Sequence, residues 1–332
     1  MSERVFRQLV ACLLGLVLAP SLALADGNNP DARAWLDKMT LAMQRLNYDG
    51  TFVYLHDQHF EAMRIVHQAE PQGERERVVS LTGAAREIIQ DGDHFTCYMP
   101  DQKSVMIGRS QPHKPYPLDF PEDTSRLTRN YVLAVSHADR MAGRDARIVT
   151  ITPRDPYRYG YRLWLETDTG MPLKSDLLDE HGATVEQVMF TTIEFLKQIP
   201  AGLLQPTLNG SGYTRHNDVG PSGENLVGER SAWRVTRLPD GFMLTHYSRH
   251  PLPNSSFPTE HMVFSDALAS LSVYIEQADD DKKMLNGTSR MGAVNAFGTV
   301  VNGHHVTVVG DVPSATVQMV GESIRYQPDP TQ

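Results

Sequence analysis

The chain has 332 residues, of which 21% are charged and 40% hydrophobic, and its formal net charge at pH 7 is −9. This composition is that of an ordinary globular protein, and the length suggests two domains. The acidic balance argues against general binding to nucleic acid, which calls for a basic surface.

The first 25 residues predict a secretory signal peptide. Arg4 and Arg7 form a short basic region, residues 9–24 are mostly apolar, and Ala-Leu-Ala at 23–25 is a small-x-small cleavage site. This three-part pattern is typical of an exported protein, here with a mature chain that begins at Asp26. A membrane anchor would need about 20 apolar residues without a helix-breaking end, so export is favoured over anchoring.

The two cysteines have different expected fates. Cys12 ends a Leu-Val-Ala-Cys stretch that resembles a lipidation site, but too short an apolar run precedes it for a cleavage site. If Cys12 is removed with the signal peptide, Cys97 is alone and no intramolecular disulfide can form. Cys97 lies in a strand pattern, which favours a buried thiol over a nucleophile.

One amphipathic helix and a long series of strands are expected next. Trp35, Met39, Met43 and Leu46 recur with a 3.6-residue period, which predicts a helix over 31–47. Runs of β-type residues between turn formers predict strands over 51–56, 63–69, 77–81, 86–90, 94–98, 147–151, 159–166, 173–178 and 185–195. Their spacing of roughly 8–12 residues favours an antiparallel meander.

Residues 103–121 interrupt this series. Prolines at 112, 115, 117 and 121 predict a loop over the whole segment. Turn formers at 168–170 and 179–182 predict tight hairpins. Many strands with one long helix suggest an open antiparallel β-barrel that carries the helix on its concave face, an arrangement that suits an apolar ligand.

Residues 209–228 contain five glycines and show no hydrophobic period, so they are expected to link a first domain, 26–208, to a second, 229–326. The second domain is expected to have strands over 233–236, 242–248, 260–265, 270–276, 292–302 and 304–309. Pro313 then opens a predicted helix. The fold class is therefore α+β: a large open barrel with a helix, and a smaller antiparallel sheet with a terminal helix.

The sequence contains no recognisable catalytic or metal-binding motif. His56 and His59 form a histidine pair, but no third ligand from a second element lies near them in the sequence. His304 and His305 are neighbours on a predicted strand, so their side chains point to opposite faces. We therefore expect a protein that is not an enzyme and has no metal or cofactor.

Two sets of side chains are candidates for binding. Large, adaptable apolar residues of the first domain suit a lipid pocket: Phe52, Tyr54, Met63, Phe95, Tyr98, Tyr161, Trp164 and Met189. Aromatic residues and arginines of the second domain suit a protein interface: Trp233, Arg234, Arg237, Phe242, Tyr247 and Arg249. An ordinary core is the alternative for the first set, and a solvated strand face is the alternative for the second.

Several motifs, in one order along nearly the whole mature chain, resemble the MucB/RseB family of envelope-stress regulators. They are LNYDGTF at 46–52, GAAREII at 83–89, the strand-turn-strand at 161–179, WRVTRLPDGF at 233–242, RHPLP at 249–253 and FSDAL at 264–268. The segment 161–179 also resembles the periplasmic lipoprotein carriers LolA and LolB.

The resemblance implies a periplasmic protein that binds the periplasmic segment of a membrane-spanning anti-sigma factor of the MucA or RseA type. Bound there, it would shield that segment from the site-1 protease and keep the sigma factor sequestered, a circuit that controls alginate production in pseudomonads. The first domain would sense lipid or lipopolysaccharide, and the second would make the main contact with the anti-sigma factor. A homo-oligomer is also possible.

Two other classes of protein remain open. A periplasmic lipid or lipoprotein carrier would need only the first domain, so the second domain argues against it. An envelope hydrolase would need a nucleophile and a base, which the sequence does not display.

Overall fold

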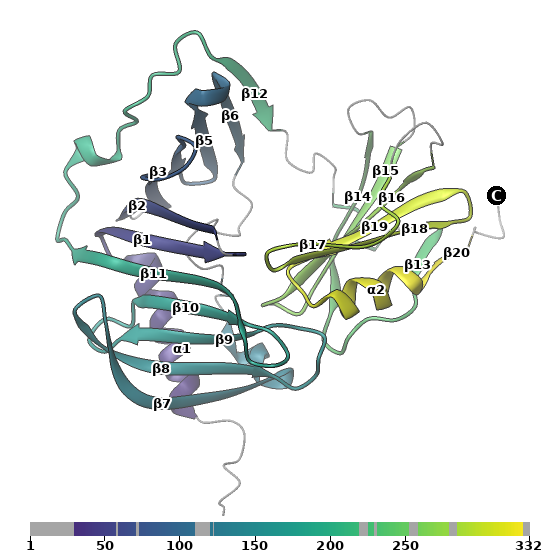
Figure 1. Cartoon of the computed structure of the whole chain (residues 1–332), viewed down its shortest axis with the longest axis horizontal. Helices are drawn as coiled ribbons and strands as arrows, with labels where there is room; N and C mark the ends of the chain where they lie inside the picture. Colours follow the sequence, from purple (N-terminus) through teal and green to yellow (C-terminus); the bar gives the residue numbers. More distant parts are fainter. Residues whose placement is uncertain are drawn as a thin grey trace, which may run out of the picture.

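The computed structural model describes residues 30–57, 59–70, 73–109, 120–121, 123–218, 225–228, 231–251, 258–278 and 284–327. The predicted signal peptide, Cys12 and the prolines at 112, 115 and 117 lie outside these residues. Two domains lie side by side (Figure 1). The larger one contains a 12-stranded sheet and helix α1, and the smaller one contains a six-stranded sheet and helix α2.

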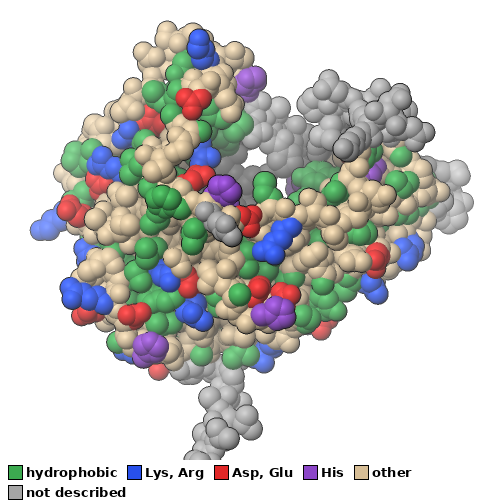
Figure 2. Space-filling view, viewed as in Figure 1, with side chains coloured by type: hydrophobic (Ala, Val, Ile, Leu, Met, Phe, Trp, Pro, Cys, Tyr) green, Lys and Arg blue, Asp and Glu red, His purple; other side chains and the backbone are tan. Residues whose placement is uncertain are grey.

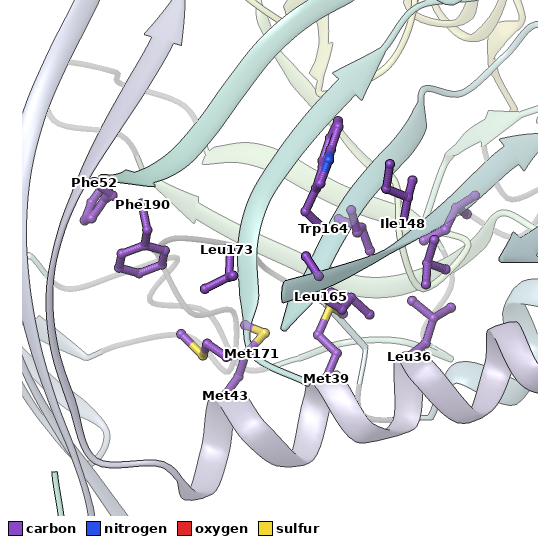
Figure 3. Close-up of a cluster of buried hydrophobic side chains, with 14 of the residues drawn as sticks. Leu36, Met39, Met43, Phe52, Ile148, Trp164, Leu165, Met171, Leu173 and Phe190 are labelled. Atoms are coloured by element: carbon purple, nitrogen blue, oxygen red, sulfur yellow. The ribbon is translucent and has the colours of Figure 1, made fainter. Parts of the chain in front are cut away.

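Helix α1 (Pro30–Arg45) confirms the predicted first helix. Its fully buried residues are Ala32, Leu36 and Met39, with Met43 at 7% exposure, so the buried stripe follows the helical period. Trp35 and Leu46, predicted on this face, are only partly buried at its margin. The helix packs mainly against the last strands of the sheet, where Leu36, Met39 and Met43 point toward Leu165, Met171 and Leu173 (Figure 3).

The large sheet is open and almost wholly antiparallel. Its strands are β1 (Tyr48–His56), β2 (His59–Glu70), β3 (Gly73–Ser80), β4 (Glu87–Asp91), β5 (His94–Met99), β6 (Ser104–Arg109), β7 (Tyr131–Met141), β8 (Arg144–Pro153), β9 (Gly160–Glu166), β10 (Pro172–Leu178), β11 (Thr184–Phe195) and β12 (Thr214–Asp218). Their order is β12-β6-β5-β4-β3-β2-β1-β11-β10-β9-β8-β7. The open antiparallel sheet with a helix confirms the expected fold class.

In the described part of the chain, three short 3-10 helices connect these strands: η1 (Pro100–Gln102), η2 (Thr124–Arg129) and η3 (Ala201–Leu204). The prediction of a loop over the whole of 103–121 was wrong for residues 104–109, which form β6 and pair with β5. The four prolines all lie beyond β6, so they do not prevent that pairing.

Strand β7 was not predicted. Its second half is polar and exposed, and its pairing with β8 is irregular between Val135 and Ala138, so it shows no clean alternation. The segment 209–228, expected to be a linker, contains β12, which runs parallel to β6. The polar sequence of β12 shows no hydrophobic pattern that would predict a strand.

The second domain has the predicted antiparallel sheet and terminal helix. Its elements are β13 (Trp233–Val235), β14 (Met243–Pro251), β15 (Pro258–Ser265), β16 (Ser270–Gln277), β17 (Gly287–Met291), β18 (Val294–Val301), β19 (His304–Gly310), α2 (Ser314–Glu322) and β20 (Ile324–Tyr326). The sheet order is β14-β15-β16-β19-β18-β17, and β13 pairs separately with β20. Strands β17 and β20 were not predicted.

Helix α2 lies against β18 and β19 and covers one face of this sheet. Val317 and Val320 are fully buried, in agreement with the predicted apolar face. The hairpin between β18 and β19 turns at Asn302 and Gly303, whose φ angles of 49° and 73° are those of a tight two-residue turn. The predicted Asn-Gly hairpin is thus confirmed.

Glu87 fastens the segment after η3 to the large sheet. Its carboxylate is 1% exposed, lies 2.6 Å from Arg77 Nε and accepts the backbone N–H groups of Thr207 and Leu208. Burial alone would raise the pKa of Glu87, but these hydrogen bonds and the guanidinium outweigh it and hold the pKa below the ordinary value.

We expect Glu87→Gln to destabilise the protein at neutral pH and to lose that effect in acid. A carboxyl group whose pKa is lower in the folded state stabilises the fold above its unfolded pKa, here near 4.5, and this stabilisation is lost as the pH falls through the folded pKa. Urea unfolding of both proteins at pH 7 and pH 3 measures the difference. The control is Glu70→Gln, because Glu70 is exposed. A difference in unfolding free energy between the original protein and Glu87→Gln that is the same at pH 3 as at pH 7 would contradict the lowered pKa of Glu87.

Candidate functional site

The first set of candidate residues falls mainly in the core of the large domain. Phe52, Met63 and Trp164 are at most 6% exposed, and Tyr54 and Tyr161 pack against the same cluster of buried side chains. Phe52 and Phe190 lie together at one end of this core (Figure 3). Five of the eight candidates therefore meet in one apolar cluster.

The other three lipid candidates lie apart from that core cluster. Phe95 and Tyr98 are partly exposed on β5, and Met189 is partly exposed on β11. A role for any of the eight in binding lipid stays a prediction.

The second set of candidates does not form one surface. Trp233, Phe242 and Tyr247 are buried in the core of the second domain. Arg249 donates to the Tyr247 hydroxyl at 3.0 Å and to Glu260 at 3.1 Å, so it supports the fold of β14 and β15. The remaining two, Arg234 and Arg237, are exposed, and Arg237 lies 4.0 Å from Glu322. Their predicted contact with an anti-sigma factor stays a prediction.

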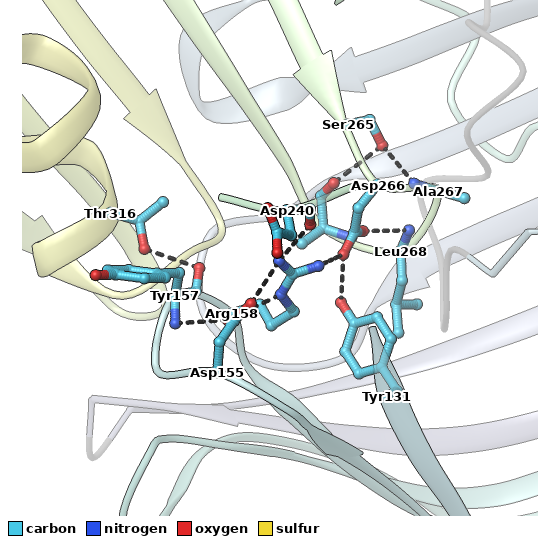
Figure 4. Close-up of polar contacts among 11 residues, drawn as sticks. Tyr131, Asp155, Tyr157, Arg158, Asp240, Ser265, Asp266, Ala267, Leu268 and Thr316 are labelled. Atoms are coloured by element: carbon cyan, nitrogen blue, oxygen red, sulfur yellow. Dashed lines mark hydrogen bonds and ion pairs between the residues drawn. The ribbon is translucent and has the colours of Figure 1, made fainter. Parts of the chain in front are cut away.

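A buried polar contact between the domains involves Arg158, a residue that the sequence analysis did not single out. Its side chain is fully buried although it is long and charged. It comes from the loop between β8 and β9 and reaches Asp266 in the turn between β15 and β16 (Figure 4). It also donates to the backbone carbonyl of Asp240 at 2.7 Å, which lies before β14.

Each group in this contact has a hydrogen-bond partner. Asp155 accepts from Arg158 at 2.8 and 3.1 Å, and the hydroxyl of Tyr131 donates to Asp266 at 3.0 Å. The second oxygen of Asp266 accepts the backbone N–H groups of Leu268 and Ala269 at 2.9 and 2.8 Å. A buried ion pair is tolerated when its remaining hydrogen bonds are made in this way.

Aromatic rings complete the surroundings of Arg158. Its guanidinium carbon lies 5.6 Å from the centre of the Tyr131 ring and 5.2 Å from that of Phe242, one ring from each domain. Burial opposes the charge on Arg158, but hydrogen bonds to Asp155 and the charge of Asp266 raise its pKa above the ordinary value. Burial also raises the pKa of the Tyr131 hydroxyl, which therefore remains a neutral donor.

A second contact joins the turn between β17 and β18 to the large domain. Asp57 accepts the backbone N–H of Gly292, and Glu186 accepts that of Ala293 at 3.0 Å. The hydroxyl of Tyr159 donates to the carbonyl of Ala293 at 3.2 Å and accepts from Asn295 at 2.9 Å. Charged side chains of both signs lie beside the line where the two domains meet (Figure 2).

Gly241 shows how closely the domains approach. Its φ is +85°, and a Cβ atom added there would lie 2.1 Å from Nδ2 of Asn130 in the large domain. A side chain at this position would therefore meet both backbone strain and a steric clash.

We expect Gly241→Ala to destabilise the contact between the domains by more than the roughly 1–2 kcal/mol of left-handed backbone strain alone. The matched control is Gly83→Ala, because Gly83 has a φ of +71° but no atom near its added Cβ. Equal losses of unfolding free energy in the two variants, measured in urea, would show that Asn130 moves aside without cost.

Sequence signals for this site were weak. Asp155 and Arg158 are three residues apart and could be suspected as a local pair, but Asp266 is 108 residues from Arg158 along the chain. Asp266 does lie within the FSDAL motif that carried the family resemblance. Among the described residues, no cluster of three or more histidine, cysteine or acidic side chains could hold a metal ion, and no helix could cross a membrane.

The fold and its domain contact define a two-domain protein in which an open sheet and a smaller sheet are held together by buried polar groups. Comparison with family models matches residues 31–208 to the MucB/RseB N-terminal domain and 228–325 to the MucB/RseB C-terminal domain. The chain therefore belongs to the MucB/RseB family.

Named relatives agree with this assignment. The chain is 33% identical over 322 residues to the sigma factor AlgU regulatory protein MucB of Pseudomonas aeruginosa, covering 93% of this chain and 96% of that one. It is 28% identical over 302 residues to the sigma-E factor regulatory protein RseB of Escherichia coli K12, covering 90% and 91%.

Solved structures of MucB share the fold. The structure of the Pseudomonas aeruginosa MucA/MucB complex matches with a TM-score of 0.72 at 31% identity, covering 90% of this chain and all of that one. A crystal structure of MucB matches with a TM-score of 0.62 at 30% identity, covering 90% and 99%. With identity and coverage nearly equal, this chain is closer in shape to the MucB of the complex.

Proposed function

We propose that this protein is a periplasmic negative regulator of an extracytoplasmic-function sigma factor. It binds the periplasmic segment of a membrane-spanning anti-sigma factor of the MucA/RseA type and shields that segment from site-1 proteolysis. Binding of lipid or lipopolysaccharide releases it. The protein acts by binding and not by catalysis.

One observation carries the proposal: the chain matches, across both domains and 90% of its length, a MucB whose structure was solved with MucA. The relatives' names as sigma-factor regulatory proteins support the same role. The greater likeness to the MucB of the complex also supports an arrangement of domains suited to a partner.

The contact between the domains offers a physical basis for release. Two domains joined by buried polar groups tend to have discrete arrangements rather than a continuum, because breaking such a contact leaves charges unpaired. A ligand that binds better to another arrangement lowers the affinity of the protein for a partner that prefers this one. The partner lowers the affinity for the ligand by the same factor.

A protease-protection experiment tests the proposal. The chain without residues 1–25 is mixed with the periplasmic segment of the anti-sigma factor from the same organism, and cleavage by site-1 protease is followed over time. We expect slower cleavage with the protein present and faster cleavage again when lipopolysaccharide is added. Unchanged cleavage would refute shielding, and lipid binding without any effect on the segment would favour the periplasmic lipid carrier.

A further inference from the structure

A pocket of about 490 Å³ opens beside the contact between the domains. It is formed by the end of β8, the loop that carries Arg158, and the turn between β10 and β11. Apolar residues that are at least partly exposed, Pro153, Pro156 and Leu178, form part of its lining. None of the candidate binding residues expected from the sequence lines this pocket.

Two of the three acidic residues that line the pocket are engaged in hydrogen bonds. Asp155 binds Arg158 through both oxygens. Asp179 accepts the backbone N–H groups of His181 and Ala183 at 2.9 and 2.8 Å, which close the hairpin turn. The third, Glu180, is exposed, and its carboxylate lies 3.8 Å from the ring of His181, which is also exposed.

Two arginines of the pocket are not engaged in this way. Arg162 on β9 is partly buried, and its side chain has no hydrogen-bond or ion-pair partner among the described residues. Its neighbour across the strands is Asp176, but that carboxylate is held by Lys174 at 3.2 Å and by Gln187 at 2.7 Å.

Arg154 is the second such arginine. It is exposed at the edge of the pocket, and only its backbone N–H has a partner, the carbonyl of Asn130. Arg154 and Arg162 therefore both line the pocket beside Leu178 and two prolines, in a protein whose overall charge is negative.

We propose that this pocket is a binding site for a phosphate-bearing ligand, anchored by Arg154 and Arg162. Guanidinium groups match the geometry and charge of phosphate oxygens, and the apolar lining suits a ligand with a hydrocarbon part beside its phosphate. Such a ligand lies against Asp155 and Arg158, the groups that join the domains. Binding of the phosphate-bearing ligand does not depend on the proposed regulatory function. Only an effect of that ligand on release of the anti-sigma factor rests on the proposed function.

Titration calorimetry of the chain without residues 1–25 tests the proposal with two probes, inorganic pyrophosphate and monomeric dihexanoyl phosphatidate. We expect saturable binding at one site, weakened by added salt because charges carry part of the affinity. Tighter binding of the phosphatidate identifies a lipid headgroup, and equal or tighter binding of pyrophosphate identifies a free phosphate compound.

Variants locate the site. We expect Arg162→Gln to weaken binding by about tenfold or more, the usual effect of losing a charged hydrogen bond, and Arg154→Gln to do the same. Arg154 is exposed, so its variant is expected to remain folded and keeps the test decisive even if Arg162→Gln unfolds. The control is Arg215→Gln on β12, an exposed arginine at the opposite end of the sheet order from β8 and β9.

Two results would overturn the proposal. One is the absence of saturable binding of both probes to the folded protein. The other is equal weakening by Arg154→Gln and Arg215→Gln, which would show attraction to surface charge in general. Cleavage of the anti-sigma-factor segment by site-1 protease is then followed with and without the bound probe. This separates the phosphate-site proposal from the proposed regulatory function, because the pocket can bind phosphate even if the protein binds no anti-sigma factor.

Discussion

Arg158→Met is expected to lower the free energy of unfolding by about 3–5 kcal/mol, the usual result of removing one partner from a buried ion pair. Asp266 would stay buried with no positive charge, although its backbone N–H partners would remain. Because Arg158 joins the two domains, we expect the loss to appear as separation of the domains rather than as unfolding of either sheet.

Small-angle X-ray scattering measures that separation as an increase in the radius of gyration, and urea unfolding measures the loss of stability. Arg129→Met is the matched control, since Arg129 is an exposed arginine of the same domain with no side-chain partner among the described residues. An Arg158→Met protein as compact and as stable as the control would show that the domain contact does not depend on this charge.

Phe52→Ala is expected to lower the free energy of unfolding by a similar amount, about 3–5 kcal/mol, as is usual for a buried phenylalanine. Phe52 is fully buried, and its ring centre lies 5.7 Å from that of Phe190 at an angle of 64°. The surroundings of Phe190 are tightly packed, since even a Cβ added to Gly50 would lie 2.8 Å from its ring.

The matched control is Phe60→Ala, because Phe60 is 59% exposed on the neighbouring strand. We expect the control to change stability by less than about 0.5 kcal/mol, as surface substitutions usually do. A Phe52→Ala protein of unchanged stability that no longer binds lipid would reverse the interpretation, since Phe52 would then line a ligand site rather than the core.

Local patterns predicted the fold well where one face of an element is buried. The helical period of Met39 and Met43 and the Asn302-Gly303 turn both lead to the observed elements, because burial and turn geometry act over a few residues. Strand β12 escaped prediction because its pairing with β6 does not impose an apolar alternation on its own sequence.

The candidate site could be predicted only in part, for the same physical reason. Trp233 and Phe242 were predicted to lie at an interface, but both are buried in a core, a possibility that residue type alone does not exclude. The significance of Arg158 comes from its full burial and from Asp266 in another domain, and neither follows from a local pattern.

We propose that this protein binds the periplasmic segment of an anti-sigma factor with its two domains in the arrangement described. The most direct test is calorimetric titration of that segment, from the same organism, into the chain without residues 1–25 and into its Arg158→Met variant. We predict saturable binding to the first and clearly weaker binding to the second. A folded protein that does not bind the segment at all would show that this proposal is wrong.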